Sequence, residues 1–311
     1  MKKWLSAAAF LTLVLAGCQQ QDSDATETPN EQTEETTEYT VTDDRGEDII
    51  LPEVPETIVS LQPSNTEILF DLGVGEKVIG VTEFDTYPEE AADIERISDS
   101  MTINAERIIE MDPDVVIAYT IGDDLQIAPL EEAGIPVFVI ETASTFEDVY
   151  GDIEQIATVV GAEERGEELI EEIKAQIAGV KEKVATLDTP KRVYFEISPA
   201  PDIWSTGEGS FQQEILKAAG IENIFADQTG WFNVSSESII EKDPEVILTT
   251  VNYVDDPIGE LMSRPAWESI TAVKNEAIYQ VDSDIMSRPA TRIGEAVELA
   301  AQTVYPELFA Q

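Results

Sequence analysis

Two glutamates occupy matching places in a segment that the chain contains twice. The stretch NAERIIEMDPDVVIAYT begins at Asn104 and SSESIIEKDPEVILTT begins at Ser235, an offset of 131 residues. Each copy predicts a short helix that stops before an Asp-Pro pair and is followed by a buried strand. Glu106 and Glu237 stand in the first helical turns, where a carboxylate complements the helix dipole by about 0.3–1 kcal/mol. That effect explains one such glutamate well, but it explains their recurrence less well.

The chain lacks the side chains on which most hydrolases and zinc proteins depend. It contains no histidine and one cysteine, Cys18. Ser–His–Asp triads, Cys–His nucleophiles, zinc fingers and intramolecular disulfides are therefore excluded. Neither a Gly-x-Ser-x-Gly motif nor a glycine-rich phosphate loop is present. We therefore expect a protein that is not an enzyme and that carries no cofactor and no metal centre of its own.

Aromatic side chains gather in segments that follow expected strands. Such segments contact ligands in α/β proteins, and aromatic rings offer contact area to large flat or greasy ligands. The alternative is that the rings belong to the core, an equally good interpretation for Tyr87 and Phe232. The candidate ligand contacts are Phe84, Tyr119, Trp204 and Trp231.

Charged candidates lie near the C-terminus, in the stretch VDSDIMSRPATR after the last expected strand. Arg288 is predicted to contact an anionic ligand, and Arg292 is a weaker candidate for the same role. The alternative for both arginines is pairing with carboxylates of this acidic chain. Asp284 and Met286 belong to the same stretch.

The elements that must position these residues alternate between strands and helices. Ile58 to Leu61 reads as a strand, a helix follows Ser64 or Asn65, and Val78 to Val81 reads as the next strand. Helical periodicity dominates about forty residues from Phe146, with a break near Gly161, and the α/β pattern restarts after Pro190. We therefore predict an α/β fold with two similar lobes, mainly parallel sheets and one long rigid connector helix. The expected boundaries are 39–145 for the first lobe, 146–188 for the connector and 189–311 for the second lobe.

The first residues have the composition of an export signal. Lys2 and Lys3 precede an apolar run too short to span a membrane, and Leu15-Ala16-Gly17-Cys18 resembles the bacterial lipobox, in which the cysteine is lipidated. We expect a signal peptide over 1–17 and a disordered acidic tether over 18–38. The formal charge of −46 argues against nucleic acid as a partner.

Several motifs, taken in order, resemble those of substrate-binding proteins of bacterial importers for ferric siderophores, haem and vitamin B12. After the lipobox these are SLQPSNTEILFDLG, NAERIIEMDPDVVIAY, a long helix, GEGSFQQEILKAAGIENIF and SRPATRIGEAVELA. The resemblance implies the helical-backbone fold of periplasmic binding proteins, with the ligand between the lobes. It also implies that Glu106 and Glu237 dock onto arginines of the permease, and that Phe84, Tyr119 and Trp231 occupy aromatic cleft positions. Ser100 stands where vitamin B12 binders often have another aromatic residue, which weakens a corrinoid assignment.

These expectations describe a lipid-anchored receptor on the extracytoplasmic face of the cell membrane. Its partners would be an ABC permease dimer with ATPase subunits, and the receptor itself is expected to be a monomer with small lobe movements. Cobalamin and hydroxamate or catecholate ferric siderophores stay open as ligands. Haem ranks lower because no histidine can serve as its axial ligand. The functional alternative is a sensor that reuses the binding fold without transport.

Overall fold

The computed structural model of the protein describes residues 38–99, 102–119 and 126–310. The predicted signal peptide, the lipidation site at Cys18, the tether up to residue 37 and Ser100 lie outside these ranges. None of the described helices is both long enough and apolar enough to cross a bilayer.

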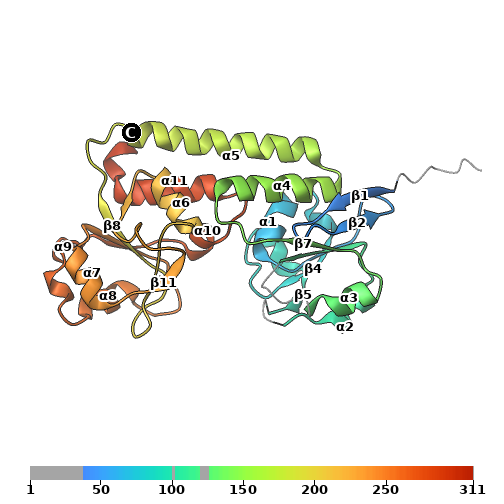
Figure 1. Ribbon diagram of the computed structural model, residues 1–311, viewed down its shortest axis with the longest axis horizontal. Coiled ribbons are helices and arrows are strands. Elements are labelled where there is room, and N and C mark those ends of the chain that lie inside the picture. The colour runs from blue at the N-terminus through green and yellow to red at the C-terminus, as the bar shows by residue number, and fades with distance from the viewer. Residues whose placement is uncertain (1–37, 100–101, 120–125, 311) are drawn as a thin grey trace, which may run out of the picture. The chain divides into compact units, whose positions relative to one another are not determined.

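The N-terminal lobe is built on a five-stranded parallel sheet with the order β5-β4-β3-β6-β7 (Figure 1). Its inner strands are buried apolar runs, as a sheet covered on both faces requires. Val115 and Ile117 face α1 and α4, while Val116 and Ala118 face α2 and α3. The elements are β1 (Tyr39–Thr42), β2 (Asp48–Leu51), β3 (Ile58–Ser60), α1 (Pro63–Asp71), β4 (Val78–Thr82), β5 (Glu95–Ser98), α2 (Ala105–Met111), β6 (Val115–Tyr119), α3 (Ala128–Glu132) and β7 (Val137–Ile140).

The C-terminal lobe repeats this plan with a four-stranded parallel sheet of order β10-β8-β12-β13. Phe195 faces α6 and α11, and Tyr194 on the other face packs with residues near α7, α8 and α9. A short antiparallel pair, β9 with β11, extends beyond the sheet. The elements are β8 (Arg192–Glu196), β9 (Trp204–Thr206), α6 (Phe211–Ala218), β10 (Glu222–Asn223), β11 (Trp231–Asn233), α7 (Ser236–Lys242), β12 (Val246–Thr249), α8 (Pro257–Ser263), α9 (Thr271–Lys274), β13 (Ile278–Gln280), α10 (Ser283–Ser287) and α11 (Ile293–Val304).

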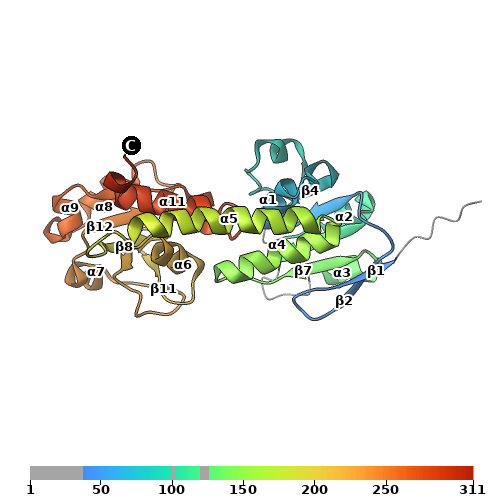
Figure 2. The ribbon, with the colours of Figure 1, turned by 90° about the horizontal axis from the view of Figure 1, so that it is seen from above.

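The helical segment between the lobes consists of two helices, α4 (Phe146–Val160) and α5 (Glu163–Val184). Gly161, with φ 67°, ends α4 in the left-handed conformation that glycine adopts without strain. The apolar face predicted for α5, from Ile170 to Val184, is buried against α4 and α11 (Figure 2). One hydrophobic cluster includes residues of both lobes and of this helical layer, so the lobes share a core.

The duplicated sequence is a duplicated structure. Asn104 caps α2 by accepting from the Arg107 N–H, and Ser235 caps α7 by accepting from the Ser238 N–H. Both helices end at an aspartate in the left-handed region, with φ 49° at Asp112 and 43° at Asp243. A parallel strand, β6 or β12, follows in each case. Each lobe therefore carries one copy because the lobes are built on the same plan.

Candidate functional site

The order of the strands indicates where each lobe can receive a ligand. In open parallel sheets, ligands bind beyond the carboxyl ends of the strands, where the strand order changes direction. This change occurs between β3 and β6 in the N-terminal lobe and between β8 and β12 in the C-terminal lobe. Phe84 follows β4, Tyr119 ends β6, and Trp204 begins β9, where its N–H donates to the carbonyl of Ser198, just beyond β8. Three of the four predicted aromatic contacts therefore lie at or just beyond these strand ends.

The two candidate rings of the N-terminal lobe differ in exposure. Phe84 is 54% exposed, which is unusual for so apolar a side chain and leaves its ring free for a partner. Tyr119 is half-buried and its hydroxyl shares a hydrogen bond with the Thr142 hydroxyl. Burial raises the pKa of Tyr119 above its ordinary value, although the bond to Thr142 opposes this, so the phenol stays neutral. Both side chains offer apolar contact, and Tyr119 adds one polar atom.

The segment that carries Phe84 is held by a buried carboxylate that the sequence did not single out. Asp85 is fully buried and accepts hydrogen bonds from the N–H and the hydroxyl of Thr82. Burial raises the pKa of Asp85 although bonds from Thr66 and Thr82 lower it. Arg96 donates to the Asp85 backbone carbonyl at 3.1 Å. These bonds fix the turn after β4 within its own lobe.

In the C-terminal lobe, Trp204 and Trp231 lie on the paired strands β9 and β11. They are 41% and 49% exposed, so the interpretation of Trp231 as a core residue does not hold. The Trp231 indole N–H donates to the Gln212 side-chain oxygen at 2.8 Å, which orients the ring. Phe232 instead packs edge-on against Phe225 with ring centroids 5.5 Å apart, and it belongs to the core.

Sequence reasoning missed Tyr253, which is 68% exposed. It lies in the segment after β12, and its hydroxyl is 3.4 Å from the Ser198 hydroxyl, in the segment after β8. The rule that selected Phe84, an aromatic residue shortly after a buried strand, would have selected Tyr253 as well. We add Tyr253 to the candidate ligand contacts of this lobe.

Arg288 and Arg292 both form ion pairs with carboxylates. Arg288 Nη1 lies 3.0 Å from Glu67 Oε1, and Arg292 Nη2 lies 2.6 Å from the same oxygen. The Arg292 guanidinium also stacks over the Tyr87 ring at 3.9 Å, so Tyr87 is a packing partner although it is 38% exposed. A ligand contact by Arg288 stays a prediction, and its positive charge is already balanced within the protein.

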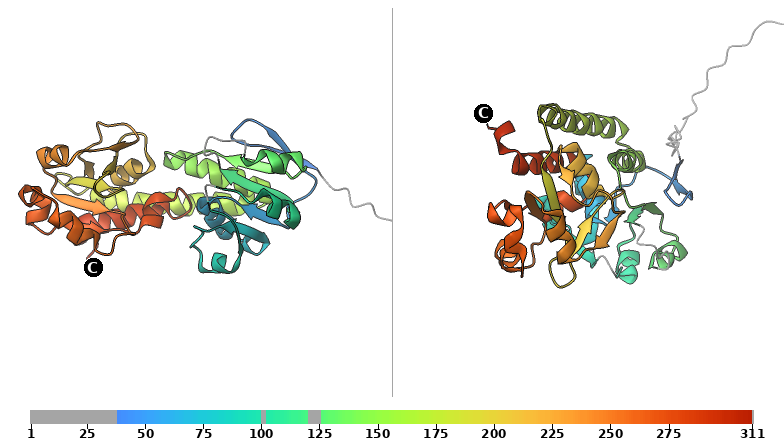
Figure 3. Two further views of the ribbon diagram at one scale, coloured as in Figure 1. Left: turned by 90° about the horizontal axis from the view of Figure 1, so that it is seen from below. Right: turned by 60° about the vertical axis from the view of Figure 1, so that its left-hand side comes forward.

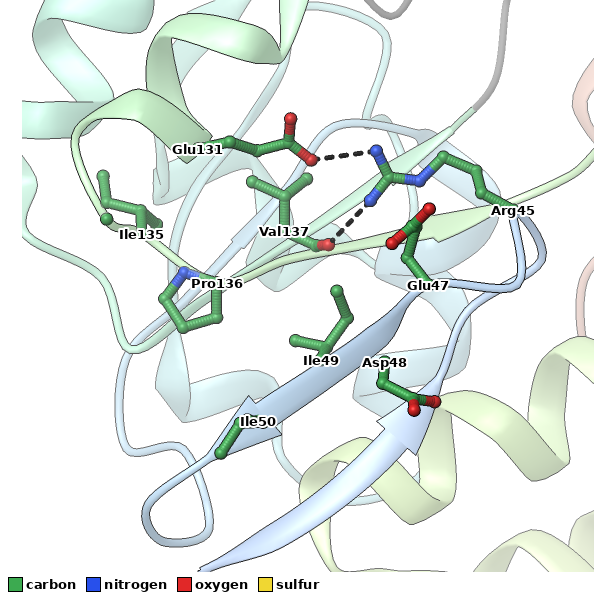
Figure 4. Close-up of a pocket in the computed structure, with 10 residues that line it drawn as sticks. Arg45, Glu47, Asp48, Ile49, Ile50, Glu131, Ile135, Pro136 and Val137 are labelled. Atoms are coloured by element: carbon green, nitrogen blue, oxygen red, sulfur yellow. Dashed lines mark hydrogen bonds and ion pairs between the residues drawn. The ribbon is translucent and has the colours of Figure 1, made fainter.

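Four hollows in the described part of the chain are lined by none of these aromatic side chains. One of about 730 Å³ lies between β2 and the segment before β7 (Figure 4). An ion pair between Arg45 and Glu131 at 2.9 Å crosses it, and Arg45 also donates to the Val137 carbonyl. This hollow borders the start of β7, an edge strand of the N-terminal sheet, and not the carboxyl ends of the strands. We therefore do not assign the ligand to it. Within the described ranges no cluster of His, Cys, Asp or Glu has the geometry of a metal site.

Glu106 and Glu237 are exposed in the first turns of α2 and α7. Among the described residues neither carboxylate has a hydrogen bond or ion pair. By contrast, the adjacent Arg107 is engaged by Glu95 at 2.7 Å and by Glu110 at 3.3 Å. The two glutamates are thus available to an external partner, one on each lobe.

Comparison with known proteins identifies the family to which this fold belongs. The family model of periplasmic binding proteins matches residues 58–285. The uncharacterized ABC transporter substrate-binding lipoprotein YvrC of Bacillus subtilis (strain 168) is 37% identical over 313 residues, covering 98% of this chain and 97% of that protein. A vitamin B12-binding protein of Vibrio campbellii (strain ATCC BAA-1116) is 32% identical over 244 residues, covering 78% of this chain and 86% of that protein.

A solved structure agrees with these relatives. The crystal structure of a possible iron-binding (periplasmic solute-binding) protein from Staphylococcus epidermidis ATCC 12228 superposes with a TM-score of 0.73 and 31% identity, covering 81% of this chain and 100% of that one. The predicted fold class, two α/β lobes with parallel sheets on a helical backbone, is confirmed. The chain belongs to the periplasmic binding protein family.

Proposed function

We propose that the protein is the lipid-anchored receptor of an ABC importer, that it binds a bulky metal chelate between its lobes, and that it performs no chemistry on it. The observation that carries this proposal is a set of exposed rings: Phe84, Trp204 and Tyr253 follow strands of the two parallel sheets, and Trp231 lies on β11, which pairs with the strand of Trp204. Exposed rings at such places suit a large flat or apolar ligand. The names of the relatives support the class: a substrate-binding lipoprotein, a vitamin B12-binding protein and a possible iron-binding protein.

The charges near the candidate site limit the classes of chelate that the protein can bind. An anionic catecholate or citrate complex requires unpaired cations in its site, and Arg288 and Arg292, the two arginines considered for contact with an anionic ligand, are already paired with Glu67. A corrinoid or a neutral ferric hydroxamate requires apolar area and a few polar atoms. Tyr119, Ser198 and the aromatic rings supply these. Cobalamin and neutral ferric hydroxamates are therefore the favoured ligands.

Delivery to the permease is the second part of the proposal. Lipidation of Cys18 would hold the receptor at the extracytoplasmic face of the membrane. Two unpaired carboxylates on separate lobes can engage arginines of a two-fold permease dimer, since Arg–carboxylate pairs are strong and directional. Glu106 and Glu237 would make these contacts. The alternative function is a sensor that binds the same ligand and engages no permease.

Charge reversal tests the docking proposal. Glu106→Lys combined with Glu237→Lys should abolish uptake of labelled ligand by cells while leaving ligand affinity of the purified receptor unchanged. The matched control is Glu110→Lys combined with Glu241→Lys, which changes the same charges on the same two helices one turn later. Uptake at the control's level by the first double variant would refute docking through these residues and favour the sensor.

A further inference from the structure

Five side chains from both lobes form one bonded cluster, which we call the inter-lobe clamp: Glu67, Thr86, Asp284, Arg288 and Arg292. Glu67, from α1, is 1% exposed and accepts hydrogen bonds from both arginines, at 3.0 Å from Arg288 and at 2.6 and 2.9 Å from Arg292. Arg288 also pairs with Asp284 at 2.8 Å. The segment around α10 and α11 meets α1 at this place (Figure 3).

The charges of the clamp balance. Two guanidinium groups, with 12% and 10% side-chain exposure, face the two carboxylates of Glu67 and Asp284. Removing one member of a buried charged network leaves its partner uncompensated, which is far costlier than loss of a surface pair. Arg288 bonds to several acceptors at once through the planar fork of its guanidinium, which lysine cannot reproduce. The clamp thus joins residues that are 198 to 225 positions apart in the sequence.

Arg288 also holds the segment 83–87, which we call the Phe84 loop. Its Nη2 donates to the Phe84 backbone carbonyl at 2.9 Å and to the Thr86 hydroxyl at 2.7 Å. The Thr86 hydroxyl in turn donates to Asp284 at 2.7 Å. Arg288, from the C-terminal lobe, therefore holds the backbone of Phe84, whose ring is exposed on the N-terminal lobe.

We propose that Arg288 is a positioning residue rather than a ligand contact: it fixes the Phe84 loop of the opposite lobe, and so sets where the Phe84 ring meets a ligand. The ligand part of this proposal rests on the proposed function. The positioning part does not, because it concerns the loop in the absence of ligand. It also explains what the motifs SNTEILFDLG and SRPATR do together, since Glu67 and Arg288 come from them.

The competing explanation is that the N-terminal lobe holds the loop alone, through Asp85 and Arg96. The two explanations can be distinguished by backbone amide hydrogen exchange of the ligand-free chain 19–311, measured on peptides that cover residues 83–87. We compare Arg288→Gln and Thr86→Val with Thr291→Val. Thr291 donates to Asp71 across the same junction but does not touch the loop, so its variant controls for loosened lobe contact.

We expect amide exchange of residues 83–87 to accelerate about tenfold or more in Arg288→Gln and Thr86→Val, because each variant loses hydrogen bonds to a charged group. Exchange of these residues should stay unchanged in Thr291→Val. Thr86 is exposed, so its variant folds even if Arg288→Gln does not. Unchanged exchange in Thr86→Val, or equal acceleration in Thr291→Val, would overturn the proposal. In a parallel cobalamin titration, Thr86→Val should weaken binding more than Thr291→Val. If cobalamin fails to bind the unmodified chain, the corrinoid assignment fails and the exchange result still decides the clamp.

Discussion

Replacing Asp152 by asparagine should stabilise the protein at neutral pH. Asp152 lies on α4, is 7% exposed, and receives no hydrogen bond from the described residues. It lines a hollow whose other polar members are Asp44, Glu141, Thr142, Glu147, Asp148 and Gln155. Burial, with the charges of Asp44 and Asp148, raises the pKa of Asp152 to about 8 from an ordinary value of 3.8. The carboxyl group is therefore protonated in the folded protein at pH 7.

The sign and size of the effect follow from proton linkage. Between pH 4 and 8 the unfolded chain releases a proton that the folded chain keeps, so this residue costs stability progressively as the pH rises. At about 1.4 kcal/mol for each pKa unit, the cost reaches the order of 4 kcal/mol at pH 7 and levels off above the folded-state pKa. Asparagine has no proton to lose, so the stability gap between variant and parent should be near zero at pH 4 and widen towards pH 8.

Urea unfolding of chain 19–311 at pH 4, 5.5, 7 and 8 measures this gap. Asp148→Asn, one turn earlier on the same helix, is the matched control with the opposite sign. The Asp148 carboxylate accepts the Ser144 and Thr145 N–H groups at 2.9 Å, and these bonds outweigh burial and lower its pKa. Its substitution should cost about 1 kcal/mol at pH 7, and the cost should shrink as the pH falls through the carboxylate range. A gap for Asp152→Asn that does not change with pH would refute the reasoning.

Three further predictions concern stability. Glu196→Gln should lower the free energy of unfolding by roughly 3 kcal/mol in urea titrations, because Arg264, with 5% side-chain exposure, loses the charge of the more buried of its two carboxylate partners and keeps only Glu260, each at 2.6 Å; a loss below about 0.5 kcal/mol would contradict this. Asp112→Val should cost about 1–2 kcal/mol, and Asp112→Gly far less, since the residue has a φ of 49° that only glycine adopts freely; equal costs would contradict the strain argument. The melting temperature should rise with NaCl, because screening relieves the repulsion of a chain with a formal charge of −46, and a melting temperature indifferent to salt would count against that explanation.

Local sequence signals predicted the parts of the fold that depend on neighbouring residues. The helices α2 and α7 and the strand β6 follow from the duplicated segments that begin at Asn104 and Ser235 and from the apolar run after Pro113, and the structure has each of them. The break at Gly161 likewise lies where the sequence placed it, and it divides the predicted connector into α4 and α5.

Contacts between distant segments were beyond the reach of sequence patterns. The pair β9 and β11 was missed because each strand has three residues and gains its stability from a partner 25 or more positions away. The environment of Arg288 depends on Glu67, which is 221 positions earlier. The sequence allowed pairing of this arginine with carboxylates but could not indicate which one, because Glu67 and Arg288 meet only through the tertiary fold.

Binding of a chelate by the exposed rings is the central claim, and intrinsic tryptophan fluorescence tests it most directly. Chain 19–311 would be titrated with cobalamin, a neutral ferric hydroxamate, a ferric catecholate and haem, with correction for absorption by each ligand. Trp204 and Trp231 are about half exposed, so a ligand on them should quench. Saturable quenching by cobalamin or the neutral hydroxamate, lost in Trp231→Ala, is the predicted result. The absence of saturable quenching by all four ligands would contradict the account.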